Sequence, residues 1–152
     1  MHTKKYHMLA FFFICLWCFG IISPLFFYNE KIFLLMQPLL NQIFSTVCHQ
    51  AHEKTISIEG VDIFVCSRCA GIYLGILGTS FITLILIPPK KTFFLLLLTL
   101  PIMLIDVLLS KLGIYHYSKL AALLTGLFLG SALILFLVNE LYYTKATKYY
   151  EK

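Results

Sequence analysis

The composition of this chain indicates a membrane protein. Its 152 residues are 60% hydrophobic and only 12% charged, and the mean hydropathy is +0.88. Soluble domains have an apolar share nearer one half, so an ordinary soluble protein is excluded. The formal net charge of +5 is better explained by membrane topology than by nucleic-acid binding, and we expect no nucleic-acid partner.

Four apolar segments are long enough, at about twenty residues each, to cross a hydrocarbon core about 30 Å thick. They cover residues 8–28, 70–87, 92–110 and 120–138. Lys4 and Lys5 precede the first as in a signal peptide, but no cleavage pattern of small residues follows it, so we expect a retained helix. The sequence therefore predicts an all-α integral membrane protein, a four-helix bundle that forms a single membrane domain over residues 1–152.

The distribution of basic residues predicts how the spans are oriented. With the N-terminus inside, the inner segments hold a net positive charge of five, from Lys4, Lys5, Lys90, Lys91, Lys145, Lys148 and Lys152 against Glu140 and Glu151. The outer segments nearly balance. The positive-inside rule then predicts a multi-pass protein of the cell (inner) membrane, with both termini cytoplasmic and residues 29–69 outside the cytoplasm.

The predicted outer loop, residues 29–69, has two halves with different periodicity. Apolar residues recur at helical spacing from Ile32 to Val47, which indicates an amphipathic helix on the membrane surface. Residues 55–58 and 61–65 alternate apolar and polar side chains around Glu59-Gly60, a pattern typical of a short β-hairpin. Such a hairpin would bring the chain that precedes it close to the chain that follows it.

Cysteines lie on both sides of this hairpin, and two histidines precede it. Cys66 and Cys69 are separated by two residues, so both thiols can face one metal ion from a tight turn. The other side of the hairpin supplies Cys48 together with His49 or His52. We therefore predict a tetrahedral site of three cysteines and one of these histidines, with zinc favoured and iron or copper as alternatives.

Two other interpretations of the cysteines stay open. In an oxidising exterior, two of the three outer cysteines could form a structural disulfide and leave one thiol over. A C-x-x-C at the start of a helix could instead carry out reversible dithiol chemistry, because its thiol pKa is lowered. The odd number of outer cysteines and the neighbouring histidines fit metal ligation better than simple pairing.

Polar residues inside the spans predict a second site. A carboxylate in hydrocarbon is costly unless it is paired, so Asp106 is expected to face the other helices, with Arg68 or Lys111 as its partner. Tyr73 and Thr125 lie at similar depth, at about 1.5 Å of rise per residue. Together these residues would line an outer-leaflet pocket for a lipid or quinone headgroup, formed by Arg68, Tyr73, Asp106 and Thr125.

Candidate catalytic residues are Asp106, Glu53 and Tyr73. The sequence contains no triad spacing, phosphate loop or paired carboxylates that would define a reaction. Whether the protein is an enzyme is therefore left open.

Two further patterns indicate close helix packing. Small residues one turn apart occur in the second and fourth spans, as Gly71 with Gly75 and Gly126 with Gly130. These faces could meet within one chain or join two copies in a homo-oligomer. Cys15 and Cys18 also form a C-x-x-C, but they lie too deep in the first span to join the outer cysteines, and we interpret them as packing residues.

One motif resembles that of a known family. It reads Cys48-His49-Gln50, then Glu53-Lys54-Thr55, then Cys66-Ser67-Arg68-Cys69-Ala70-Gly71-Ile72-Tyr73-Leu74-Gly75. This motif is similar to the signature of small prokaryotic membrane proteins called domain of unknown function 2085. The likeness covers residues 48–130, and it includes an Asp in the third span at Asp106 and a Thr-Gly in the fourth at Thr125-Gly126.

The resemblance has consequences for both predicted sites. His52 is not part of the signature, so the resemblance implies that His49 is the fourth metal ligand. The family often has an arginine three residues before the fourth-span Thr, where this chain has Ala122. A pocket that depends on that charge would lose anion binding here. The resemblance implies no particular activity.

Three function classes follow. The first is a membrane protein with an extracytoplasmic Cys/His metal site above the outer-leaflet pocket. The second is a membrane thiol-disulfide oxidoreductase that uses Cys66 and Cys69 with a quinone, although this chain has only Cys48 as a further outer cysteine to pass electrons on. The third is a transporter or a structural membrane protein, which the absence of a repeated half does not favour.

Overall fold

The computed structural model describes residues 2–86, 92–114 and 116–150. Its elements are α1 (His2–Phe27), α2 (Lys31–Ser45), the 3-10 turn η1 (His52–Lys54), β1 (Thr55–Ile58), β2 (Val61–Cys66), α3 (Ser67–Ile85), α4 (Thr92–Lys111) and α5 (Lys119–Tyr150). Among these residues, four helical segments are long and apolar enough to cross a membrane: Lys5–Phe27, Ser67–Ile85, Thr92–Lys111 and Lys119–Leu141.

The predicted fold class is confirmed, with small shifts at the ends of the spans. α3 begins three residues before the predicted start at residue 70, because Ser67, Arg68 and Cys69 form its first turn. Its predicted end at residue 87 lies outside the described residues. The helix α5 extends well past the predicted end at residue 138, as a polar continuation of an apolar span.

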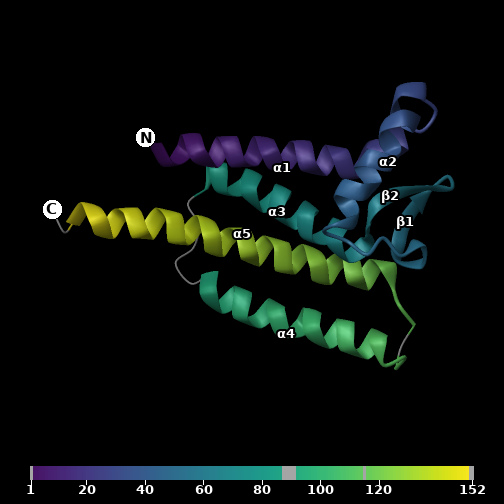
Figure 1. Cartoon of the computed structure of the whole chain (residues 1–152). Helices are drawn as coiled ribbons and strands as arrows, with labels where there is room; N and C mark the ends of the chain where they lie inside the picture. The colour runs from purple at the N-terminus through teal and green to yellow at the C-terminus, as the bar shows by residue number, and fades with distance from the viewer. Residues whose placement is uncertain (1, 87–91, 115, 151–152) are drawn as a thin grey trace.

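The four spans lie side by side in an open row (Figure 1). Contacts join α1 to α3, α3 to α5 and α5 to α4, so α1 and α4 are at opposite edges of the row (Figure 1). The four spans expected from the sequence are thus present, and their order in the row is α1, α3, α5 and α4. Both termini lie at one end of the row, and α2 with the hairpin lies at the other, which we call the hairpin end (Figure 1).

Glycines bring the backbones of α3 and α5 into direct contact. A Cβ at Gly71 would overlap the carbonyl oxygen of Leu123, and one at Gly130 would overlap that of Ile72. Gly75 and Gly126 face the partner backbone in the same way. The two small-residue faces therefore meet each other within one chain, where the absence of side chains allows the close approach.

The hairpin forms where the alternation predicts it. β1 and β2 pair antiparallel, with Thr55 opposite Cys66 and Ile58 opposite Val61. At the turn, Glu59 has φ 53° and Gly60 has φ 81°, the backbone conformation of a tight two-residue hairpin turn. Because the strands pair in this register, the end of η1 lies beside the start of α3.

The helix α2 joins the hairpin to α1 through a small aromatic core. Its two buried residues, Phe33 and Phe44, lie on one face, and the Phe44 ring stacks on Phe64 of β2 with centroids 5.4 Å apart. Trp17 of α1 meets the Phe44 ring edge-on at 5.0 Å. The opposite face of α2 carries exposed apolar residues, Ile32, Leu35 and Leu39.

Candidate metal centre

Three thiols from three separate segments meet at the hairpin end. The Sγ atoms of Cys48, Cys66 and Cys69 all lie within 4.8 Å of one another. Cys48 follows α2, where its N–H donates to the Phe44 carbonyl at 3.0 Å. Cys66 ends β2 and caps α3, and Cys69 lies in the first turn of that helix. The hairpin thus brings Cys48 to Cys66, which is 18 residues later in sequence, and to Cys69.

The environment of Cys66 favours the thiolate form of its side chain. The backbone N–H of Cys66 donates to the Cys48 sulfur at 3.1 Å, and a donor of this kind stabilises negative charge on sulfur. The hydrogen bond from the Cys69 thiol lowers the pKa of the Cys66 thiol, and this effect outweighs the opposing effect of burial. Thiolate is the form of cysteine that binds metals and attacks disulfides.

Neither histidine of the outer loop lies in this group of sulfurs. His49 is exposed beside Cys48, and it is not among the three side chains that the described structure brings together. His52 is 81% exposed, and its Nδ1 pairs with an Asp62 carboxylate oxygen on β2. Among the described residues, therefore, no fourth protein ligand joins the three sulfurs of the predicted tetrahedral site.

Gln50, which was not among the predicted site residues, helps to position the cysteine cluster. The Gln50 side-chain amide donates to the Phe64 carbonyl at 2.9 Å and to the Asn41 carbonyl at 3.3 Å. The backbone of Gln50 has φ 48°, a left-handed conformation that is uncommon for residues other than glycine. Gln50 thus ties the segment after Cys48 to both α2 and β2. The motif Cys48-His49-Gln50 could have indicated this role, because the amide group of Gln50 has two N–H donors and can donate to two carbonyls at once.

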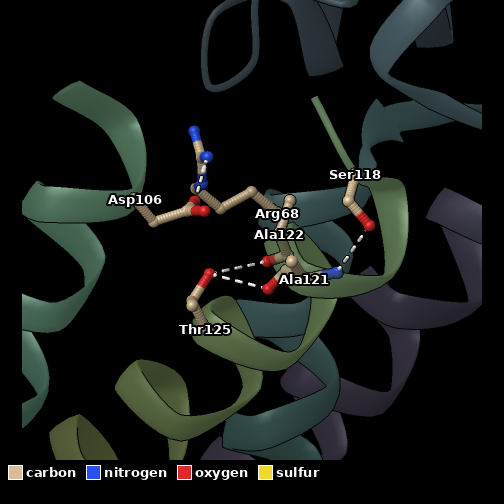
Figure 2. A network of polar contacts seen from close by, with 6 residues as sticks. All are labelled: Arg68, Asp106, Ser118, Ala121, Ala122 and Thr125. Carbon is tan, nitrogen blue, oxygen red and sulfur yellow. Dashed lines mark hydrogen bonds and ion pairs between the residues drawn. The ribbon is translucent and has the colours of Figure 1, made fainter. Parts of the chain in front are cut away.

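Asp106 is paired with the first of its two expected partners. Arg68 Nη2 lies 2.5 Å from Asp106 Oδ2, and the two side chains are 17% and 10% exposed. The pair joins α3 to α4 at the hairpin end, and Figure 2 shows the guanidinium lying over the carboxylate. Arg68 thereby neutralises a carboxylate that would otherwise be costly in a membrane.

Comparison with known protein families gives a match that is consistent with a membrane protein. The model of a family described as predicted membrane proteins (DUF2085) matches residues 48–136. The chain belongs to this family.

Two other proteins are similar in sequence to this DUF2085 protein. An uncharacterised protein of Methanothermobacter thermautotrophicus is 38% identical over 87 residues, which cover 55% of this chain and 78% of that protein. Another, from Methanocaldococcus jannaschii, is 30% identical over 78 residues, covering 49% of this chain and 50% of its own length. No solved structure matches the chain. All three cysteines, Arg68 and Asp106 lie inside the family match.

The four residues of the predicted pocket do not converge in this DUF2085 protein. Tyr73 lies five residues after Arg68, and at about 3.6 residues per turn the two point about 140° apart around α3. Accordingly, Arg68 faces Asp106 on α4, whereas the Tyr73 ring lies 6.1 Å from Trp17 of α1. The Thr125 hydroxyl lies near the ion pair but donates to the carbonyls of Ala121 and Ala122 in its own helix (Figure 2).

Tyr73 lines a separate apolar cavity between α1, the hairpin and α3. This cavity has a volume of about 190 Å³, and Cys18, Ile63 and Ala70 also line it. The Cys18 thiol is buried and points to the Tyr73 carbonyl at 3.8 Å. Glu53, the remaining catalytic candidate, is exposed in η1 and lies outside the group of sulfurs.

Proposed function

We propose that this DUF2085 protein binds one thiophilic metal ion at the hairpin end through Cys48, Cys66 and Cys69, with zinc as the favoured ion. The observation that carries the proposal is the mutual approach of the three sulfurs to within 4.8 Å. Zinc bound tetrahedrally at about 2.3 Å from each sulfur needs sulfurs about 3.8 Å apart, so ligation requires only a small contraction. The lowered pKa of the Cys66 thiol also supports ligation, because thiolate is the form that binds metals.

The proposed site needs a fourth metal ligand in addition to the three cysteines. His49 is adjacent in sequence to a ligating cysteine and is exposed, so a change in its side-chain rotamer and in the local backbone would be required to bring it in. Water or another small ligand would otherwise complete the coordination. An open position of this kind is typical of zinc sites with chemistry, and a closed site is typical of structural zinc.

Orientation forms a second part of the proposal. We infer that the hairpin end faces the outside of the cell membrane and that both termini are cytoplasmic. The lysines near the terminal end of the row support this, because basic residues concentrate on the cytoplasmic side. Labelling of a single cysteine introduced at Glu59 in a variant without the other cysteines, using a reagent that cannot cross the membrane, tests the orientation.

A second candidate function has one specific observation in its favour. The hydrogen bond from Cys69 that lowers the pKa of the Cys66 thiol also suits a reactive dithiol. In that case Cys66 and Cys69 would be oxidised to a disulfide while a quinone takes up two electrons and two protons and becomes a quinol. The unpaired Cys48 in the same group fits a metal ligand better than this cycle.

Metal analysis of the purified full-length protein separates the two candidates. We expect one equivalent of metal in the wild type and its loss in Cys48→Ser, Cys66→Ser and Cys69→Ser. Cys15→Ser is the matched control, because it makes the same substitution in α1, outside the group of sulfurs, and should keep the metal. A metal-free wild type with two oxidised thiols that turns over with quinone would overturn the metal proposal.

A further inference from the structure

Tyr117 lies beside two cations that come from different segments of the chain. Its ring centroid is 5.5 Å from Lys54 Nζ and 5.9 Å from Arg68 Cζ. Lys54 ends η1, Arg68 is in the first turn of α3, and Tyr117 precedes α5. Contacts of this length are favourable cation–π interactions. The Tyr117 ring therefore holds two positive charges near one another at the hairpin end.

The position of Lys54 is fixed by the backbone rather than by its own side chain. The fully buried Ser67 hydroxyl donates to the Lys54 carbonyl at 2.8 Å, and this bond ties η1 to the start of α3. Tyr117 is half-buried, so its ring is partly withdrawn from solvent. Lys54 and Arg68 thus lie at a partly buried surface formed by η1, the start of α3 and the residues before α5.

Arg68 has hydrogen-bonding capacity that its carboxylate partner does not use. Its Nη2 reaches Asp106 Oδ2, but its buried Nε has no hydrogen-bond partner among the described residues. A buried N–H without an acceptor is unfavourable, and an unsatisfied group in an otherwise ordered site points to a ligand or water. A planar guanidinium with a free edge is well suited to the oxygens of a phosphate.

The charges of Lys54, Arg68 and Asp106 sum to one positive charge. Lys54 and Arg68 contribute two positive charges, and Asp106 contributes one negative charge. The nearby Asp62 is engaged by Ser57 and His52 on the hairpin side. A ligand with one negative charge would therefore complete the site, and a phosphodiester carries one such charge.

The depth of the site matches the level of lipid phosphates. Arg68 is the second residue of the span Ser67–Ile85, and Asp106 lies five residues before the end of the span Thr92–Lys111. Lys54 and Tyr117 lie just beyond the spans. The ends of spans coincide with the headgroup region of a bilayer, where basic side chains meet phosphate groups.

We propose that Arg68, Lys54 and Tyr117 form a binding site for a phosphate group, supplied by a phospholipid of the leaflet at the hairpin end. Arg68 donates from the edge that Asp106 does not use, Lys54 adds the second positive charge, and Tyr117 keeps both side chains in place. This site uses none of the three cysteines, so it is independent of the proposed metal centre.

Lipid titration of the full-length protein, delipidated in detergent, tests this site. The probe is dioleoyl phosphatidylglycerol, the readout is thermal stability, and dioleoylglycerol supplies the same chains without phosphate. We expect phosphatidylglycerol to raise the melting temperature of the wild type and dioleoylglycerol to leave it unchanged. Lys54→Gln should raise the half-saturating lipid concentration about fivefold, the effect of one lysine near an anionic lipid.

Lys31→Gln is the matched control, because it removes an exposed lysine at the same end of the molecule and should leave the half-saturating concentration unchanged. The double variant Arg68→Gln/Asp106→Asn removes both charges of the ion pair without stranding either, and it should weaken the lipid response at least as much as Lys54→Gln. Cys48→Ser should keep the lipid response, so failure of this proposal is distinguishable from failure of the metal proposal.

Three results would overturn the inference. The first is an equal response to dioleoylglycerol, which would mean that only the chains bind. The second is an equal loss in Lys54→Gln and Lys31→Gln, which would indicate general attraction to the surface. The third is full stabilisation by inorganic phosphate alone, which would assign the site to the free anion and exclude the lipid.

Discussion

The backbone N–H of Cys66 donates to the sulfur of Cys48 across the base of the hairpin. The strand that positions one ligand therefore also stabilises the charge on another. Any change that disturbs the hairpin register should alter the placement of the sulfurs and break this hydrogen bond.

Gly60 tests the dependence of the metal centre on the hairpin. Its φ of 81° is one that L-residues adopt at a cost, while a Cβ there would meet nothing within 4 Å. Gly60→Val should therefore destabilise the turn by about 1–2 kcal/mol through backbone strain alone. We expect weaker metal binding, measured by competition with a chelator. Gly78→Ala also adds a Cβ in open space, but in a helix, and should leave metal affinity unchanged.

The Arg68–Asp106 pair should show strong energetic coupling. Asp106→Asn leaves the mostly buried guanidinium without its counter-charge and should cost about 3–5 kcal/mol of stability. The double variant Arg68→Gln/Asp106→Asn should be more stable than either single variant, because no charge is left alone. Denaturant unfolding in detergent measures the cycle. Lys111→Gln removes a nearby exposed cation outside the pair, and an equal effect of that variant would contradict the assignment.

Gly71 should be indispensable for packing of α3 on α5. An added methyl would overlap the backbone carbonyl of Leu123, and backbone cannot move aside as a side chain can. Gly71→Ala should separate the helices and lower the melting temperature, with a loss of about 1–3 kcal/mol that is typical of overpacking. Gly78→Ala makes the same change on the same helix in open space. Equal melting temperatures for the two variants would show that the helices do not approach as closely as described.

Asp62 predicts a dependence of hairpin stability on acid pH. Partial burial raises the pKa of this carboxyl, but hydrogen bonds from Ser57 and His52 outweigh burial and hold the pKa below its ordinary value. A lowered pKa in the folded state gives stability that is present above the unfolded pKa, near pH 4, and is lost as the pH falls through the folded value.

The Ser57→Ala variant checks this dependence, because it removes one of those hydrogen bonds. We expect a smaller loss of stability between about pH 5 and pH 2 than in the wild type, followed by protease sensitivity of the hairpin. Ser45→Ala is the control, since the Ser45 hydroxyl bonds only a carbonyl of its own helix in the described contacts. An identical acid profile in wild type and Ser57→Ala would contradict the role of Asp62.

Much of the fold follows from local patterns. Hydrophobic length predicts the spans, and alternation around Glu59-Gly60 predicts the hairpin, because both signals depend on neighbours in sequence. The order of helices in the row depends on which faces meet, and sequence spacing alone does not determine that. The approach of Cys48 to Cys66 could be inferred because a hairpin returns the chain.

The outer-leaflet pocket was predicted from the depth of its residues in the membrane, and depth alone was not sufficient. Tyr73 and Arg68 have similar depth, but depth does not distinguish sides of a helix, and their angular separation around α3 could have excluded a shared pocket. Tyr117 could not be identified in advance, since its contacts with Lys54 and Arg68 join segments far apart in sequence. The role of Gln50 likewise requires the positions of two distant carbonyls.

The order of helices in the row also bears on how the protein is assembled during synthesis. α3 and α5 run in the same direction (Figure 1), so the chain must cross the membrane once between them, and α4 provides that crossing. The ribosome therefore delivers α4 before α5, the neighbour against which it packs. Because Arg68 lies on the span that precedes α4, we expect that Asp106 already has a counter-charge available before α5 inserts.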